Sequence, residues 1–311
     1  MSYKLLSYQA GGHARAGALI ADMVYDVIKL TGDSAGATVL GALASWSRTS
    51  RRVAQAARRI EAGKSRMKGV PLGRVKLLAP VLYPGAIFCA GANYRDHAEE
   101  MARVQGLPLE KDQKELGLAP WHFIKTARGS VVGPGAKVKL PAYSQMVDWE
   151  IELAAVIGRP ARNVTVDHAL DHVAGYTIAN DLSARDAMKR PHLPDASPFK
   201  VDWLSQKCFD GSCPLGPWIT PASEIRDPQS LAMKLWVNDE LMQDSNTGRM
   251  IFSTAEQIAH LSTRVTLAPG DLILTGTPAG VGMARRRFLK PGDAVKLWIE
   301  GIGELLNAVT A

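Results

Sequence analysis

Three acidic side chains in the middle of the chain have the types and spacing of metal ligands. Glu150 and Glu152 begin an apolar run over residues 150–157, and alternate residues of a strand project from the same face. Two carboxylates held this close repel each other unless a cation or protons neutralise them. Asp181 is a candidate third ligand because it ends another short apolar run, although it could equally cap a following helix. Three oxygen ligands with water completing the shell are typical of Mg²⁺ or Mn²⁺.

The same residues also fit simpler structures. Alternating polar residues are common on the exposed face of an edge strand, so Glu150 and Glu152 alone do not require a metal. Zinc is the less favoured ion, because the sequence has no H-E-x-x-H segment and no cluster of cysteines and histidines.

A histidine and a glutamate form a candidate acid/base pair. His97 and Glu100 are three residues apart in a segment that is typical of the start of a helix, so both would lie on one helix face. There the carboxylate could orient the imidazole and stabilise its protonated form, which is the arrangement of a general base. The same spacing also fits an ordinary surface contact.

The segments that must position these residues are short, apolar and separated by proline and glycine. Many short strands with few long helices between them predict an α+β protein that is predominantly β, and the regular alternation of a dinucleotide-binding fold is absent. The expected strands cover residues 75–78, 86–90, 137–140, 150–157, 173–179, 233–237, 272–275 and 294–299.

The first part of the chain has a different pattern. Strand-like segments over residues 3–8 and 18–27 precede a helical pattern over 42–60, and a basic stretch over 64–74 has the composition of a linker. We therefore predict a small N-terminal α+β domain over residues 1–75 and a catalytic domain over 76–311. Residues 104–119 are expected to form a loop, either an active-site lid or a solvated excursion.

The composition is that of a folded protein with an excess of basic residues. The 311 residues include 37 Lys+Arg and 30 Asp+Glu, a formal charge of +7. The basic clusters lie in no helix-turn-helix, zinc-finger or RNA-binding signature, so we expect a solvated basic face or a small anionic substrate, and no nucleic acid. Three cysteines cannot all pair, which indicates a reducing compartment.

The sequence also favours a particular location. No apolar run approaches the roughly 18 residues that span a bilayer, and the first residues lack the apolar core of a signal peptide. We therefore expect a cytoplasmic protein that makes no use of a membrane.

Five segments together resemble a known family. In chain order they are Asn-Tyr-Arg-Asp-His-Ala-Glu-Glu at 93–100, Asp-Trp-Glu-Ile-Glu-Leu at 148–153, Ala-Asn-Asp-Leu-Ser-Ala-Arg-Asp at 179–186, Lys-Cys-Phe-Asp-Gly-Ser-Cys-Pro-Leu-Gly-Pro at 207–217 and Thr-Gly-Thr-Pro-Ala-Gly-Val-Gly at 275–282. Together they are similar to the signature segments of the fumarylacetoacetate hydrolase family, and the resemblance covers about residues 75–311. The chain looks most like bacterial acylpyruvases and 2-hydroxyhepta-2,4-diene-1,7-dioate isomerases of that family.

The resemblance implies a mixed β-roll fold, a homodimer and a divalent cation, Mg²⁺ or Mn²⁺, bound by Glu150, Glu152 and Asp181. It implies that His97 and Glu100 act as an acid/base dyad. Lys207 would direct its ammonium at the substrate or at metal-bound water, unless it is a surface lysine. The residues that it suggests for substrate binding are Tyr94, Lys125, Arg185, Gln243 and Thr277.

Two of these residues have open alternatives. Arg185 could pair with a substrate carboxylate or brace Asp181, and Gln243 could be a hairpin residue. Lys125 matches a family position that is commonly followed by proline, where this chain has Thr126.

The implied activity is metal-dependent hydrolysis of a carbon–carbon bond in a β-diketo acid, such as an acylpyruvate from the breakdown of aromatic compounds. A water molecule deprotonated by His97, with Glu100 behind it, would attack the distal carbonyl. The alternative is an oxaloacetate-type decarboxylase or a 2-oxo-diene-dioate isomerase that uses the same site. In each case the expected partner is a small anionic 2-oxo acid.

Overall fold

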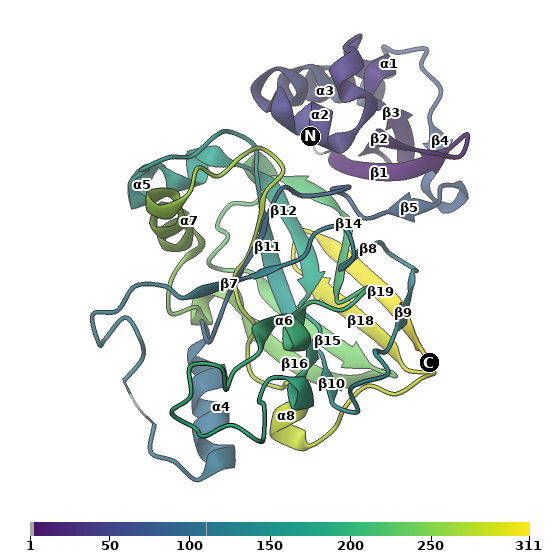
Figure 1. The fold of residues 1–311 in the computed structure, drawn as a ribbon. Coiled ribbons are helices and arrows are strands. Elements are labelled where there is room, and N and C mark those ends of the chain that lie inside the picture. The colour runs from purple at the N-terminus through teal and green to yellow at the C-terminus, as the bar shows by residue number, and fades with distance from the viewer. Residues whose placement is uncertain (1–2, 110) are drawn as a thin grey trace.

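The computed structural model describes residues 3–109 and 111–311, and a twelve-stranded sheet forms its centre (Figure 1). Along the main path, each strand pairs with the next, in the order β4 (Val70–Pro71), β3 (Met23–Asp26), β2 (His13–Ile20), β1 (Lys4–Ala10), β14 (Cys213–Pro221), β12 (Val173–Asn180), β11 (Ile151–Ile157), β17 (Leu272–Leu274), β6 (Ile87–Ala90) and β7 (His122–Lys125). Beside this path, β5 (Leu77–Leu78) pairs with β1, and β8 (Val131–Val132) pairs with β14.

A second sheet packs against the first. It contains β16 (Glu240–Asn246), β15 (Ala232–Val237), β18 (Ala294–Ile299), β19 (Gly303–Thr310) and β9 (Lys137–Lys139), and a separate pair joins β10 (Val147–Asp148) to β13 (Ser183–Ala184). In β18 every second residue is buried, as the alternation in its sequence predicts. The prediction of a predominantly β, mixed fold is confirmed.

Strand β11 is buried along its whole length because each of its faces belongs to a different core. Ile151 and Leu153 join one hydrophobic cluster together with residues of the second sheet, whereas Ala154 and Val156 join another cluster that reaches the N-terminal helices. A strand covered on both faces has a continuous apolar sequence, and the two glutamates at its start are the exception.

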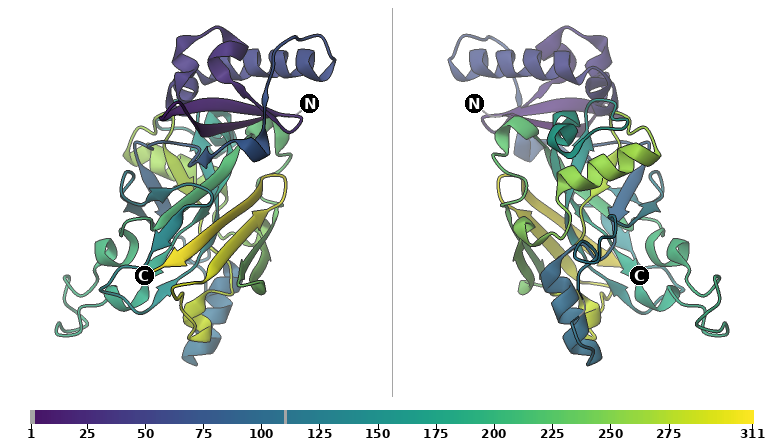
Figure 2. Two further views of the ribbon diagram at one scale, coloured as in Figure 1. Left: turned by 90° about the vertical axis from the view of Figure 1, so that its right-hand side faces the viewer. Right: turned by 90° about the vertical axis from the view of Figure 1, so that its left-hand side faces the viewer.

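Eight α-helices lie around the sheets within the described residues. They are α1 (Val27–Thr31), α2 (Val39–Ala44), α3 (Trp46–Glu61), α4 (Arg95–Gln105), α5 (Val166–Ala169), α6 (Trp203–Lys207), α7 (Thr254–Arg264) and α8 (Gly282–Arg285). Helices α1 to α3 cover one end of the molecule, and α4 and α8 lie at the opposite end (Figure 1, Figure 2). Single-turn 3₁₀ helices cover Ser34–Ala37, Leu72–Arg74, Leu170–His172, Arg185–Ala187, Ala222–Glu224 and Thr247–Arg249.

The N-terminal part differs from its prediction in two places. The expected strand over 18–27 is two strands, because Ala21 and Asp22 adopt positive φ angles of 45° and 62° and turn the chain back on itself. The expected helix over 42–60 begins at Val39 and is interrupted at Ser45, which separates α2 from α3.

Strand pairing joins the N-terminal part to the rest of the chain. Leu5 of β1 pairs with Ile219 of β14, so one sheet runs through both predicted domains. The boundary at residue 75 therefore stays a prediction.

Helix α4 ends at Gly106, whose φ of 66° is the left-handed conformation that commonly ends a helix. The loop that follows has no helix or strand among its described residues, and Glu110 lies outside them. Two ion pairs hold the loop, Arg95 with Asp112 and Lys114 with Glu256. No helix in the described ranges is both long and apolar enough to cross a bilayer.

Candidate active site

The three predicted metal ligands meet where β11 begins and β12 ends. These strands pair antiparallel, and the backbone N–H of Asp181 donates to the carbonyl of Glu150 at 2.9 Å. The pairing brings one carboxylate oxygen from each of Glu150, Glu152 and Asp181 within 4.8 Å of the others. All three side chains are buried, with exposures of 6%, 1% and 1%. We call Glu150, Glu152 and Asp181 the carboxylate cluster.

Two lysines contact this cluster directly. The ammonium of Lys207 donates to Glu150 at 2.9 Å and to Asp181 at 2.7 Å, and the ammonium of Lys125 donates to the other oxygen of Asp181 at 2.7 Å. Both lysines are buried. Lys207 is thus not a surface lysine, and Lys125 supports a carboxylate even though Thr126 follows it.

Arg185 completes the set of cations. Its guanidinium donates to Asp148 and to Glu150. Among the described ion pairs, Arg185 has no contact with Asp181, because the two oxygens of Asp181 contact the two lysines. Arg185 therefore supports Glu150 and Asp148 instead. Asp148 also accepts from the backbone N–H groups of Gly282 and Met283 and so fixes the start of α8.

The cations act unequally on the two glutamates. Burial by itself raises the pKa of Glu150, but Lys207 and Arg185 outweigh it and lower that pKa to about 2. For Glu152, burial and the charges of Asp181 and Glu150 all raise the pKa well above its usual value. Glu152 is the carboxylate whose charge the protein leaves least compensated.

The residues fit a divalent cation. Four carboxylates, Asp148, Glu150, Glu152 and Asp181, face only three cations, so with all four ionised this buried group has an excess negative charge. Buried charges are stable only when they are paired or bound to a metal. Oxygen ligands of this kind suit Mg²⁺ and Mn²⁺.

His97 and Glu100 both lie in α4, as predicted, but they contact different groups. Burial lowers the pKa of His97, and its Nδ1 is buried without a hydrogen-bond partner within the described structure. Glu100 instead accepts a hydrogen bond from the backbone N–H of Gly280 at 2.8 Å. The carboxylate therefore anchors α4 to the 275–282 loop rather than orienting the imidazole through a hydrogen bond.

The 275–282 loop supplies further contacts to the cluster. Gly276 has a positive φ of 95°, and its N–H donates to Glu152 at 2.7 Å. The amide of Gln243 donates to the hydroxyl of Thr277 at 2.9 Å and accepts from the backbone N–H of Ile151 at 3.0 Å. Gln243 thus joins the loop to the start of β11 and acts as a positioning residue.

A cavity of about 190 Å³ opens beside the cluster. The predicted residues that line it are His97, Glu150, Arg185, Lys207 and Thr277. Tyr94 does not line it, because its side chain is fully buried and its hydroxyl donates to the sulfur of Met233 at 3.3 Å. The geometry gives Tyr94 a place in the core rather than a contact with a ligand.

Sequence reasoning missed the other side chains of the cavity wall. These are Ala90, Ala92, Gln113, Trp121, Phe123, Met188, Trp203 and Gln206. A signal was available for two of them, since Phe123 and Lys125 lie two residues apart in β7 and share a face, and Trp121 directly precedes the strand at the same spacing. The contribution of Trp203 depends on the packing of α6 against β7, which the sequence does not reveal.

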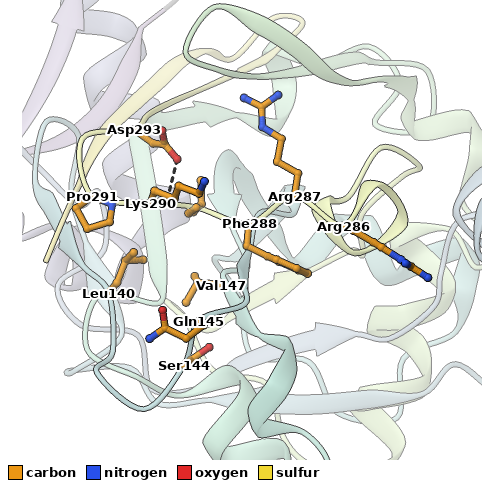
Figure 3. A pocket seen from close by; sticks show the side chains of 11 residues that line it. Leu140, Ser144, Gln145, Val147, Arg286, Arg287, Phe288, Lys290, Pro291 and Asp293 are labelled. Carbon is orange, nitrogen blue, oxygen red and sulfur yellow. Dashed lines mark hydrogen bonds between the residues drawn. The ribbon is translucent and has the colours of Figure 1, made fainter.

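Another cavity, of about 530 Å³, lies between the 140–147 segment and the 286–293 segment (Figure 3). Figure 3 shows Arg286, Arg287 and Phe288 around it, and the hydrogen bond from the backbone N–H of Lys290 to the carboxylate of Asp293. None of the predicted site residues lines this cavity, so the chemistry belongs to the smaller one.

Comparison with known proteins assigns the chain to a family. The family model described as the C-terminal domain of fumarylacetoacetate hydrolase matches residues 86–310. The chain belongs to the fumarylacetoacetate hydrolase family. The segment that matches contains the carboxylate cluster, His97 and the 275–282 loop.

Three members of the family illustrate its range. Human mitochondrial oxaloacetate tautomerase FAHD2B is 43% identical over 242 residues, which are 77% of this chain and 71% of that protein. The structure of fumarylacetoacetate hydrolase from Exiguobacterium antarcticum has a TM-score of 0.75 at 32% identity and covers 100% of both chains. Maleylpyruvate hydrolase from Sphingobium sp. SYK-6, in complex with manganese(II) and pyruvate, has a TM-score of 0.73 at 30% identity, covering 99% of this chain and 98% of that one.

Proposed function

We propose that this protein is a metal-dependent hydrolase that cleaves a carbon–carbon bond in a small β-diketo acid of the acylpyruvate type. The observation that carries the proposal is one cavity lined both by Glu150 of the carboxylate cluster and by His97, a buried imidazole with an unpartnered nitrogen. A base without another partner, next to a site for a cation, suits proton transfer to and from a bound 2-oxo acid.

Glu150, Glu152 and Asp181 would hold the divalent cation. When bound, Mg²⁺ or Mn²⁺ would supply Lewis-acid stabilisation for negative charge that develops on the 2-oxo acid. The manganese and pyruvate in the related maleylpyruvate hydrolase support this choice of ion and of ligand class.

The side chains of the cavity would transfer the proton and orient the substrate. His97 takes a proton from water, and the water oxygen bonds to the distal carbonyl carbon. The carbon–carbon bond then breaks, its electron pair stays with the pyruvate fragment, and His97 returns the proton to C3 of that fragment. The products are a carboxylic acid and pyruvate. Lys207 and Thr277 line the same cavity and would orient the substrate oxygens.

A second candidate function comes from the relatives. The human protein that is 43% identical is named an oxaloacetate tautomerase. Tautomerisation moves a proton between C3 and the oxygen of the 2-oxo group, so His97 could perform it without attacking water. Decarboxylation of oxaloacetate and isomerisation of an unsaturated 2-oxo acid are related possibilities on the same residues.

Product analysis separates these reactions. Chelator-treated protein is incubated with Mn²⁺ and, in separate reactions, with acetylpyruvate, oxaloacetate and an unsaturated 2-oxo acid, and acetate and pyruvate are quantified. We expect Mn²⁺-dependent release of acetate and pyruvate from acetylpyruvate, and a loss of at least about 100-fold in His97→Gln. Replacement of the exposed His168 by Gln is the matched control. Turnover of oxaloacetate alone would replace the hydrolase proposal by the second candidate.

The homodimer implied by the family resemblance is also a proposal. Light scattering coupled to size-exclusion chromatography tests it directly, because a dimer has twice the 33.5 kDa mass of the chain. The cytoplasmic location stays a prediction as well, since the human relative is named as mitochondrial.

A further inference from the structure

Part of the cavity lining is aromatic. The ring centroids of Trp121 and Trp203 are 4.8 Å apart, those of Phe123 and Trp203 are 5.6 Å apart, and those of Trp121 and Phe123 are 5.8 Å apart. These three rings form one continuous surface, which we call the aromatic wall. Trp121 and Trp203 keep exposures of 42% and 38%, so much of their surface is free to contact a ligand.

The ionic and aromatic parts of the cavity meet at Lys207. Its ammonium lies 5.0 Å from the centroid of the Phe123 ring while it contacts Glu150 and Asp181. A ligand whose 2-oxo acid end lies at the carboxylate cluster would therefore extend its other end along the aromatic wall.

A glycine makes room for this wall. A Cβ atom on Gly91 would lie 2.2 Å from Cζ3 of Trp121, which is far inside a normal contact distance. Gly91 does not have a positive φ angle, so the backbone conformation does not require a glycine here. The missing side chain instead leaves space for the indole of Trp121.

The cations of the cavity are already paired. Of the described residues that line it, Arg185 and Lys207 carry fixed positive charge, and each contacts two carboxylates. None of the remaining polar side chains of the lining carries a fixed positive charge; they are His97, Gln113, Glu150, Gln206 and Thr277. The amide oxygen of Gln206 is buried without a partner within the described structure. The wall thus offers a distal carboxylate no cation of its own.

We propose that the aromatic wall of Trp121, Phe123 and Trp203 binds the distal end of the substrate and selects 2-oxo acids whose distal group is small, uncharged and apolar. This inference rests on the proposed function, because it assumes that the 2-oxo acid end lies at the carboxylate cluster. It also distinguishes this chain from an enzyme built for a dicarboxylate such as oxaloacetate.

Two physical effects produce the selection. Burial of an alkyl group against the rings is favourable by about 25 cal/mol per Å² of apolar surface. A carboxylate in the same place loses its hydration without gaining a cation, and the negative faces of the rings oppose it. The cavity volume of about 190 Å³ limits the distal group to a short chain.

A matched pair of unreactive ligands tests the proposal without turnover. 2-Oxopentanoate and 2-oxoglutarate have the same five-carbon chain and differ at the distal end, which is a methyl group in one and a carboxylate in the other. Calorimetric titration into the Mn²⁺-loaded protein should give a Kd for 2-oxopentanoate at least about tenfold lower than that for 2-oxoglutarate. Pyruvate, which has no distal group, serves as the reference ligand.

Three variants assign the preference to the wall. Trp203→Ala and Trp121→Leu each remove one ring, and Gly91→Ala displaces Trp121 without removing an aromatic group. All three should reduce the preference for 2-oxopentanoate to less than about threefold while leaving the Kd for pyruvate within about threefold of wild type. Trp236→Leu, which lies in β15 outside the cavity, should keep the wild-type preference.

The outcomes separate failure of this inference from failure of the proposed function. Binding of pyruvate together with equal or tighter binding of 2-oxoglutarate overturns the aromatic-wall proposal and leaves the proposed function standing. A preference that survives in Trp203→Ala and in Gly91→Ala also overturns it. Absence of pyruvate binding in the Mn²⁺-loaded protein overturns the proposed function and, with it, this inference.

Discussion

Among single residues, Glu152 is the carboxylate whose charge a bound cation would compensate most. It is buried, and its neighbours Glu150 and Asp181 repel its charge, while Lys207 and Arg185 contact Glu150 rather than Glu152. The charge of Lys207 and the hydrogen bond from the backbone N–H of Gly276 compensate the charge of Glu152 only in part. The stability of the protein should therefore respond to metal through this residue.

Glu152→Gln tests this dependence. The variant removes a repelled charge but keeps an oxygen that can accept from Gly276, so we expect the metal-free variant to melt at a higher temperature than metal-free wild type. Addition of Mn²⁺ should raise the Tm of wild type and have much less effect on the variant. Thermal unfolding followed by circular dichroism, with and without chelator, measures both effects. A lower Tm for the metal-free variant would contradict this account.

His122 predicts a pH dependence at a residue away from the carboxylates. Burial lowers its pKa from 6.5 to about 4. Between these values the unfolded chain binds a proton that the folded chain does not, so stability should fall as the pH falls from 6.5 towards 4. His122→Phe should flatten this part of the stability curve, as measured by urea unfolding at a series of pH values. An unchanged slope in the variant would exclude His122 as its source.

The site residues were predictable to different degrees for physical reasons. Glu150 and Glu152 share a face because of strand geometry, which spacing reveals, and pairing of β11 with β12 then brings Asp181 to them. The hydrogen bond of Glu100 was not predictable from the sequence, because its donor, Gly280, is 180 positions away along the chain. The spacing alone favours a contact with the nearby His97.

At the scale of elements, Asp148 connects three segments. Its carboxylate accepts from Arg185 and from the first N–H groups of α8, and it lies in β10 shortly before Glu150 and Glu152. Breaking a buried ion pair from one side leaves an uncompensated charge, which is costly.

Asp148→Asn should therefore destabilise the protein by about 3 kcal/mol, since the amide cannot satisfy both Arg185 and α8. Chemical unfolding of the chelator-treated variant measures the loss. Asp171→Asn, at a side chain that is 68% exposed, should change stability by less than about 0.5 kcal/mol. Equal effects of the two substitutions would show that the contacts of Asp148 contribute little.

The predicted strands lie close to the observed ones, whereas the helices and turns of the N-terminal part do not match as well. Short apolar runs bounded by proline and glycine mark strands clearly, as in β12 and β18. The turn at Ala21 and Asp22 has no glycine or asparagine to mark it, and Ser45 interrupts a helical pattern that continues on both sides.

At the scale of the whole molecule, one hydrophobic core spans the two predicted domains. The cluster that contains Trp46 and Val53 of α3 also contains Ala154 of β11 and Leu272 of β17. The pairing of β1 with β14 adds backbone hydrogen bonds across the same junction. The N-terminal part and the catalytic part therefore depend on each other for burial of apolar surface.

This shared core predicts a single cooperative unfolding transition. Differential scanning calorimetry of the metal-free protein should show one peak, with a calorimetric enthalpy equal to the van't Hoff enthalpy. Two resolved transitions would contradict the shared core and would support residues 1–75 as an independent domain.

In the proposed function, the carboxylate cluster and His97 together move a proton at C3 of a 2-oxo acid, a step that hydrolase and tautomerase chemistry share. Exchange of the methyl hydrogens of pyruvate for deuterium, followed by proton NMR in D₂O, measures that step directly. We predict exchange that requires Mg²⁺ and falls at least about 100-fold in His97→Gln. Exchange that persists at the wild-type rate after chelation, or in the variant, would contradict proton transfer by the carboxylate cluster and His97.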